Sequence, residues 1–224
     1  MNGNIRLEKV ASFVRKDATL VDIGCDHGFL TIDLVKQYLI KYAYASDVNQ
    51  GPLDNVKANV LKEGLQDKIE CVLSNGLEKF ENIHFSDIVI AGMGGTLIID
   101  ILSDNIELLK DKRLILQPNI NAKGLRNWLI ENDFKIINDD LVKDNDIIYQ
   151  IIVVEGNGNE EYSSLEYEFG KYNLINNNNL LKEYMNLKVS KNNEILSKMP
   201  EDNEKYEYFK KINEEMEEYL NEIE

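Results

Sequence analysis

The chain has 224 residues, 43% of them hydrophobic, which suffices for the core of one α/β domain with an appendage. Its formal net charge of −15 argues against a nonspecific nucleic-acid binder, since such proteins are usually basic, but it leaves room for a local basic surface. The sequence shows no membrane span or apolar signal core. Its two cysteines lack metal-ligand spacing, so we expect reduced thiols in the cytoplasm.

Residues 1–16 predict an amphipathic helix with an excess of positive charge. Within this segment Arg6, Lys9, Arg15 and Lys16 are opposed only by Glu8. A solvated helix surface is the default explanation of such a patch, and a helix that contacts RNA is the alternative.

Short apolar runs then alternate with segments of helical periodicity. Seven runs are predicted strands: 19–26, 42–48, 69–74, 87–93, 113–118, 134–142 and 147–155. Four segments are predicted helices: 27–41, 51–63, 96–110 and 123–132. This alternation favours βαβ units and a mostly parallel sheet. Only residues 143–146 separate the last two strands, so these strands must form an antiparallel hairpin, as is typical of methyltransferases that use S-adenosylmethionine (SAM).

The first strand runs into the sequence DIGCDHG, which predicts a tight glycine turn before a helix. Gly24 permits close approach of a ligand to backbone N–H groups. The spacing is not that of the GxGxxG dinucleotide motif, and the carboxylate of Asp26 would repel a pyrophosphate. A cationic ligand, such as the amino group or the sulfonium of SAM, suits this turn better. A purely structural turn is the alternative.

The second and third strands each end on a polar side chain. Asp47 is placed to accept hydrogen bonds from both hydroxyls of a ribose, with Val48 and Asn49 beside the adenine. A strand-end acid or a helix cap is the alternative for Asp47. Asn75 can bond an adenine edge while Gly76 lets the loop fold over the ring, although an Asn-Gly turn needs no ligand.

The fourth and fifth strands end in loops suited to a planar ligand. The fourth runs into the glycine-rich segment 92–95 at the sheet edge where ligands of open α/β folds bind. The fifth ends in a segment that contains Gln117, Asn119 and Asn121, whose amides can read the edge of a base.

The composition changes near residue 156. Residues 156–159 look like a linker, residues 176–179 a polar turn, and residues 180–224 two helices separated by Met199 and Pro200, with Pro200 near a helix start. We expect an antiparallel helical pair of coiled-coil type that either packs its own apolar seam or serves as a substrate-binding arm. The predicted domains are therefore 1–157 and 158–224.

Four motifs in combination, DIGCDHGFL, SDVNQGPLDNVKANV, DIVIAGMGGTLI and LILQPNINAKGLRNWL, resemble the bacterial tRNA (adenine-N1)-methyltransferases of the TrmK type, which modify adenine 22. The resemblance covers about residues 5–155 motif by motif and the acidic tail more loosely. It implies a Rossmann-like class I methyltransferase fold, SAM as the cofactor and tRNA as the partner, with no metal and no membrane. We expect a monomer.

The resemblance also implies roles for individual residues. The residues expected at the cofactor are Asp22, Gly24, Asp26, His27, Gly28, Asp47, Val48, Asn49, Asn75, Gly76, Gly92 and Met93. The residues expected to hold the target adenine near the methyl group are Gly92, Met93 and Gly94. The residues expected to contact tRNA are Arg6, Lys9, Gln117, Asn119, Lys123 and Arg126. Asn75 departs from the aspartate that the family pattern leads us to expect, but its amide oxygen can still accept from an adenine amino group.

The chemistry so implied needs no general base, because adenine N1 carries a free lone pair that can attack the sulfonium methyl directly. Positioning and desolvation would carry catalysis, and a paired adenine must first be exposed. The alternatives are a SAM-dependent methyltransferase that acts on a protein or a small molecule, and a non-catalytic SAM-binding interaction protein. An NAD oxidoreductase is disfavoured by the absence of GxGxxG.

Overall fold

Seven strands form a single sheet in the computed structural model, which describes residues 4–37, 39–176 and 178–223. The strands are β1 (Thr19–Ile23), β2 (Tyr42–Asp47), β3 (Ile69–Leu73), β4 (Asp87–Gly94), β5 (Arg113–Ile120), β6 (Phe134–Asp144) and β7 (Ile147–Asn157). Their order is β3-β2-β1-β4-β5-β7-β6. The first five strands pair in parallel, and β7 runs antiparallel to both β5 and β6. The mostly parallel sheet with a C-terminal hairpin is thus confirmed.

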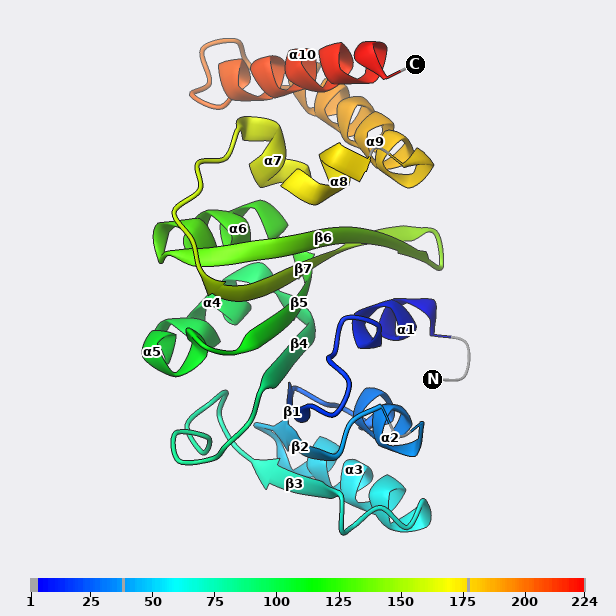
Figure 1. Ribbon diagram of the computed structural model, residues 1–224. Coiled ribbons are helices and arrows are strands. Elements are labelled where there is room, and N and C mark those ends of the chain that lie inside the picture. Colours follow the sequence, from blue (N-terminus) through cyan, green and yellow to red (C-terminus); the bar gives the residue numbers. More distant parts are fainter. Residues whose placement is uncertain (1–3, 38, 177, 224) are drawn as a thin grey trace.

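Helices cover both faces of the sheet (Figure 1). One face carries α1 (Ile5–Ala11), α2 (Phe29–Lys36) and α3 (Gln50–Lys62), and the other carries α4 (Gly95–Ser103), α5 (Ile106–Leu109) and α6 (Ala122–Glu131). Side chains of successive strand residues point to opposite faces, so Leu20 packs in one hydrophobic cluster and Val21 in the other. The sheet is therefore buried on both sides, which explains the nearly continuous apolar runs of its central strands.

One predicted helix is divided in two. The prediction of a single helix over residues 96–110 is wrong, since α4 ends at Ser103 and α5 begins at Ile106. Asp104 and Asn105 interrupt it, and the Asn105 side chain donates to the carbonyl of Ile101 at 3.3 Å. Short polar side chains that bond the backbone in this way compete with helical hydrogen bonds.

The C-terminal region holds four helices, α7 (Ser164–Phe169), α8 (Lys171–Asn176), α9 (Asn179–Leu196) and α10 (Tyr206–Glu222). The predicted linker over 156–159 is wrong in part, because β7 continues through Asn157. Helices α7 and α8 were not predicted, although Ser163 and Glu166 form a capping box that is visible in the sequence. Pro200 lies in the loop before α10 and does not mark its start.

The tail packs on the hairpin as well as on itself. A third hydrophobic cluster joins Phe169, Leu181 and Ile212 of the tail helices to Leu141 of β6. In Figure 1, α7 and α8 lie between the hairpin and the α9–α10 pair. Within the described residues, no helix is both long and apolar enough to cross a membrane.

Candidate functional site

The glycine turn after β1 is bent by left-handed backbone conformations. Gly24, Asp26 and Gly28 have φ values of +72°, +52° and +70°. The N–H groups of Gly24 and Cys25 donate to the carbonyl of Ser46 at 2.8 and 3.0 Å, so these two groups tie the turn to β2 and do not point at a ligand. A Cβ on Gly24 would lie 2.1 Å from the terminal methyl of Met93, so glycine here lets the end of β4 approach the turn.

A cavity of about 320 Å³ lies beside this turn at the carboxyl edge of the sheet. Its wall comes from helix α1, from the β1 turn with the start of α2, and from the end of β4. The lining includes Arg6, Asp22, Asp26, His27, Gly92 and Met93. The structure therefore brings together the predicted residues of the turn and of the glycine-rich loop.

Asp22 is the buried carboxylate of the cavity wall. It is 6% exposed and accepts a hydrogen bond from the Thr31 hydroxyl at 2.7 Å. Burial raises the pKa of Asp22 to about 6; the Thr31 hydrogen bond lowers it, and the charge of Asp47 raises it further. A buried carboxylate with no cationic partner among the described residues favours a positively charged ligand. Asp26 faces the same cavity but is mostly exposed.

Cys25 also lines the cavity, and its thiol is unreactive. Its side chain is buried and forms no disulfide. Burial, followed by the charges of Asp22 and Asp47, raises the pKa of the Cys25 thiol. The thiol therefore stays protonated and is a poor nucleophile.

Asp47 and Asn75 stand at the ends of neighbouring strands with acceptor oxygens available. One oxygen of Asp47 accepts from the backbone N–H of Asn49 at 2.8 Å, and the other accepts no hydrogen bond from the described residues. The amino group of Asn75 donates to Glu78 at 2.8 Å, which leaves its amide oxygen to accept. Val48 and Asn49 are exposed beside them, and Gly76 has a φ of +56°. These oxygens suit ribose hydroxyls and an adenine amino group respectively.

The glycine-rich segment lies at the end of β4, since β4 runs to Gly94 and α4 begins at Gly95, and it departs from regular strand geometry. Register shifts occur on both sides of Met93 where β4 pairs with β5. Gly92 has a φ of +84° and is exposed, and its carbonyl accepts from the Asn119 side chain at 2.7 Å. A Cβ on Gly95 would lie 2.4 Å from the carbonyl oxygen of Asn121, so glycine there allows contact between the two loops. Gly94 lies within the same irregular stretch.

Two of the predicted tRNA contacts are wrong as direct contacts. Arg126 is fully buried and pairs with the equally buried Asp139, its Nε donating at 2.8 Å. Its guanidinium also donates to the carbonyls of Tyr167 and Glu168 in α7. Gln117 is fully buried too, and its amide is bonded to other protein side chains. Neither side chain reaches solvent, where RNA would meet it.

The remaining predicted tRNA contacts are accessible to different degrees. Asn119 is exposed. Lys9 is partly exposed and pairs with Asp140 at 2.5 Å. Lys123 donates to the hydroxyl of Tyr208 in α10 at 2.5 Å. Arg6 is partly exposed and lines the cavity beside the β1 turn.

A second groove of about 650 Å³ lies between the end of β5 and α9. Asn119 and Ile120 form one wall, and Tyr184, Lys188 and Lys191 form the other. Tyr149 of β7 lines it as well. The sequence predicts a helix from the spacing of Tyr184, Lys188 and Lys191, but it does not predict this groove, because β7 and α9 carry no local motif that places them beside the end of β5.

Within the described residues, no group of three or more His, Cys, Asp or Glu side chains is arranged to hold a metal ion.

The sheet order, the antiparallel last strand and the cavity at the carboxyl edge define a Rossmann-like methyltransferase fold. A family model described as tRNA (adenine(22)-N(1))-methyltransferase matches residues 20–222. The chain therefore belongs to this family.

Individual relatives agree with this assignment. The chain is 34% identical to the tRNA (adenine(22)-N(1))-methyltransferase of Bacillus subtilis over 167 residues, which cover 74% of this chain and 70% of the relative. It is similar to Mycoplasma capricolum TrmK in complex with S-adenosyl-homocysteine, with a TM-score of 0.87, 31% identity and 98% of each chain covered. It is also similar to Streptococcus pneumoniae Sp1610 in complex with S-adenosyl-L-methionine, with a TM-score of 0.88, 35% identity and coverage of 96% of this chain and 98% of that one.

Proposed function

We propose that the protein transfers the methyl group of SAM to N1 of adenine 22 in tRNA. The observation that carries the proposal is the cavity at the sheet edge, which is lined both by the buried carboxylate of Asp22 and by the exposed glycine backbone at the end of β4. Membership of the family and relatives solved with SAM or its product support the same chemistry.

The residues that line the cavity and those at the ends of the neighbouring strands β2 and β3 together fit SAM. Asp47 would hold the ribose hydroxyls, and Asn75 with Gly76 would hold the adenine. The carboxylates of Asp22 and Asp26 would balance the positive charge of the ligand. His27, Gly28, Val48 and Asn49 would complete the wall around it. When bound, SAM supplies an electrophilic methyl group on a sulfonium.

The loop formed by Gly92, Met93 and Gly94 would hold the acceptor adenine. Its N1 lone pair is nucleophilic without deprotonation, so the site needs to align the base and exclude water. Because N1 lies on the Watson–Crick edge, the base must be unpaired before it can enter.

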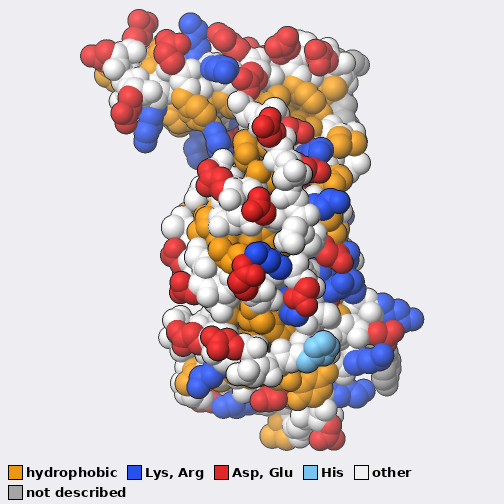
Figure 2. Space-filling view, turned by 60° about the vertical axis from the view of Figure 1, so that its left-hand side comes forward, with side chains coloured by type: hydrophobic (Ala, Val, Ile, Leu, Met, Phe, Trp, Pro, Cys, Tyr) orange, Lys and Arg blue, Asp and Glu red, His pale blue; other side chains and the backbone are white. Residues whose placement is uncertain are grey.

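Contacts to the phosphate backbone must be local, because the chain as a whole is strongly acidic. Residues 156–224 hold eight lysines and sixteen acidic residues, and acidic side chains spread over the helices at the top of Figure 2. Lys9 and Lys123 remain our candidates for phosphate contacts. We further propose a monomer that works in the cytoplasm, in keeping with its two unpaired cysteines.

The test is to incubate the pure protein with labelled SAM and an unmodified tRNA transcript and then to digest the RNA to nucleosides. We expect 1-methyladenosine, and we expect none when adenine 22 of the transcript is replaced by guanine. If no tRNA yields 1-methyladenosine, the proposal is wrong, and an acceptor of another class, such as a protein, has to be sought.

A further inference from the structure

A chain of side-chain hydrogen bonds runs from helix α1 to the glycine-rich loop. Arg6 donates through Nη1 to Oε1 of Gln117. Gln117 donates through Nε2 to Oδ1 of Asn119 at 3.1 Å, and Asn119 donates through Nδ2 to the carbonyl of Gly92 at 2.7 Å. The hydrogen bonds thus connect Arg6, which is 111 positions from Gln117 in sequence, to the glycine-rich end of β4 that lines the cavity.

The guanidinium of Arg6 sets the direction of this chain. A guanidinium only donates, so the oxygen of Gln117 must face Arg6 and its amino group must face Asn119. The oxygen of Asn119 must then face Gln117, and its amino group must face Gly92. Because Gln117 is fully buried, water cannot replace these partners. Arg6 is itself held over the ring of Tyr149, with 5.4 Å between its Cζ and the ring centroid.

Asn119 keeps one N–H and one oxygen lone pair for a further partner, since its amide makes one hydrogen bond through each group. Its side chain is exposed. Gly92 lines the cavity and Asn119 lines the second groove, so the hydrogen bond between them joins the walls of the two spaces. A base that enters from the groove would pass this amide before it reached the cavity.

A donor and an acceptor side by side match the Hoogsteen edge of adenine. Adenine offers N6 as a donor and N7 as an acceptor there, whereas guanine offers two acceptors. Pairing on this edge leaves N1, on the Watson–Crick edge, free to attack.

We propose that Asn119 reads the N6 and N7 groups of the target adenine, and that Arg6 is a positioning residue that orients the Asn119 amide through Gln117. This inference rests on the proposed function. It makes Arg6 part of base selection, in place of the phosphate contact expected from its position in a basic segment.

The first test compares tRNA transcripts that carry adenosine or 7-deazaadenosine at position 22. Removing N7 deletes one hydrogen bond, so we expect kcat/KM of the native protein to fall about tenfold. Asn119→Ala should be slow on both substrates, with a ratio of kcat/KM values near one. Because the ratio is compared between variants, any change in the reactivity of N1 itself cancels. SAM affinity of Asn119→Ala, measured by calorimetry, should stay within about threefold of the native value.

The second test separates orientation from packing at Arg6. The quantity compared is the 7-deaza ratio, which is kcat/KM on the adenosine transcript divided by kcat/KM on the 7-deazaadenosine transcript. Lysine in Arg6→Lys offers only donors, so this variant should keep most of the native ratio. Glutamine in Arg6→Gln can also accept a hydrogen bond, so that variant should bring the ratio toward one. Glu8→Gln, at an exposed position of the same helix, is the matched control and should leave both rate and ratio unchanged. If Arg6 served only for packing, both Arg6 variants would react more slowly, and their 7-deaza ratios would equal that of the native protein.

The outcomes distinguish this inference from the proposed function. Equal 7-deaza ratios in the native protein and in Asn119→Ala, with 1-methyladenosine still formed, would overturn the edge assignment alone. Unchanged ratios in Arg6→Gln would overturn the positioning role. A native protein that forms no 1-methyladenosine from the adenosine transcript overturns both proposals.

Discussion

Asp22 and Asp47 come from neighbouring parallel strands and meet at one edge of the sheet, where their environments differ. Asp22 is buried with one hydroxyl partner, so its charged form is disfavoured, whereas Asp47 receives a backbone N–H and retains an accepting oxygen. Two carboxylates at one site thus suit different parts of one ligand, a positive charge and a pair of hydroxyls.

Asp22 should make the free energy of unfolding fall as the pH rises from 4 to 6. Its pKa in the folded protein, about 6, exceeds its ordinary value of 3.8, so the folded state binds more protons in this range. The destabilisation is complete above pH 6 and amounts to about 3 kcal/mol at ~1.4 kcal/mol per pKa unit. Urea unfolding between pH 4 and 7 should show Asp22→Asn gaining stability relative to the native protein by that amount. A difference that does not vary with pH would refute this assignment.

Asp47→Ala should weaken SAM binding by at least about 100-fold, because two hydrogen bonds to a charged acceptor are lost at roughly 1.5–3 kcal/mol each. Isothermal calorimetry measures this directly. Asp54→Ala, on the exposed side of α3, is the control and should bind as the native protein does. Unchanged affinity in Asp47→Ala would remove the ribose contact from the site.

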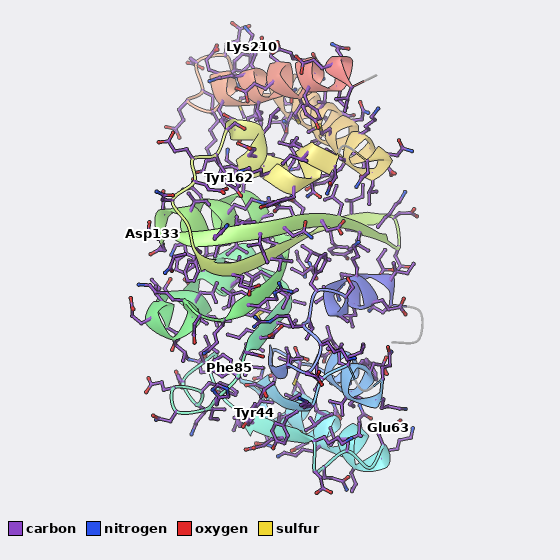
Figure 3. All side chains as sticks on the ribbon, viewed as in Figure 1. Tyr44, Glu63, Phe85, Asp133, Tyr162 and Lys210 are labelled. Carbon is purple, nitrogen blue, oxygen red and sulfur yellow. The ribbon has the colours of Figure 1, made fainter. Side chains whose placement is uncertain are left out.

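At the scale of elements, helix α6 links the end of β5 to the tail. It begins directly after β5, and Arg126 on its buried side bonds Asp139 of β6 and two carbonyls of α7. Tyr162 lies at the same junction, where the chain passes from β7 to α7 (Figure 3). Its hydroxyl is buried without a partner in the described structure, and burial raises its pKa.

Arg126→Met should cost about 3–5 kcal/mol of stability, because it leaves the buried carboxylate of Asp139 uncompensated. The double variant Arg126→Met with Asp139→Leu should recover most of this loss in urea unfolding. Lys198→Met removes an exposed pair with Glu194 and should cost less than about 0.5 kcal/mol. If Arg126→Met were as mild as this control, the buried pair would not hold the junction together.

At the scale of the whole molecule, the tail is acidic, packs on the hairpin and completes the surroundings of Arg126. Our proposed domains, 1–157 and 158–224, place the carbonyl partners of Arg126 in the second domain and Arg126 in the first. Leu141 of β6 likewise shares a cluster with Phe169. We infer that α7 and α8 stabilise the first domain, although they follow it in sequence.

A chain that ends at residue 176 should therefore keep a folded SAM site, whereas one that ends at residue 157 should be several kcal/mol less stable, because Arg126 loses two acceptors and Leu141 loses its cover. Thermal unfolding and calorimetric SAM titration of the two truncated chains measure this. Equal melting temperatures would show that α7 and α8 contribute nothing to the first domain.

Local pattern accounts for much of the architecture. Alternating periodicities predict the strands and most helices of the first domain, and a four-residue connection allows only a hairpin between β6 and β7. The polar ends of β2 and β3 were recognisable because carboxyl ends of parallel strands share one edge. Helices α7 and α8 were missed because each is too short for a periodic signal, and the capping box was the only local cue.

The sequence by itself determined the fold class and which polar residues stand at the ends of β2 and β3, because both depend on neighbours within a few positions along the chain. Only the tertiary structure decided which of the predicted tRNA contacts are accessible from solvent. Arg126 and Gln117 are buried, and Arg6 meets Gln117 across 111 positions. Burial and pairing of this kind depend on elements that meet only when the sheet is assembled, so no local pattern encodes them.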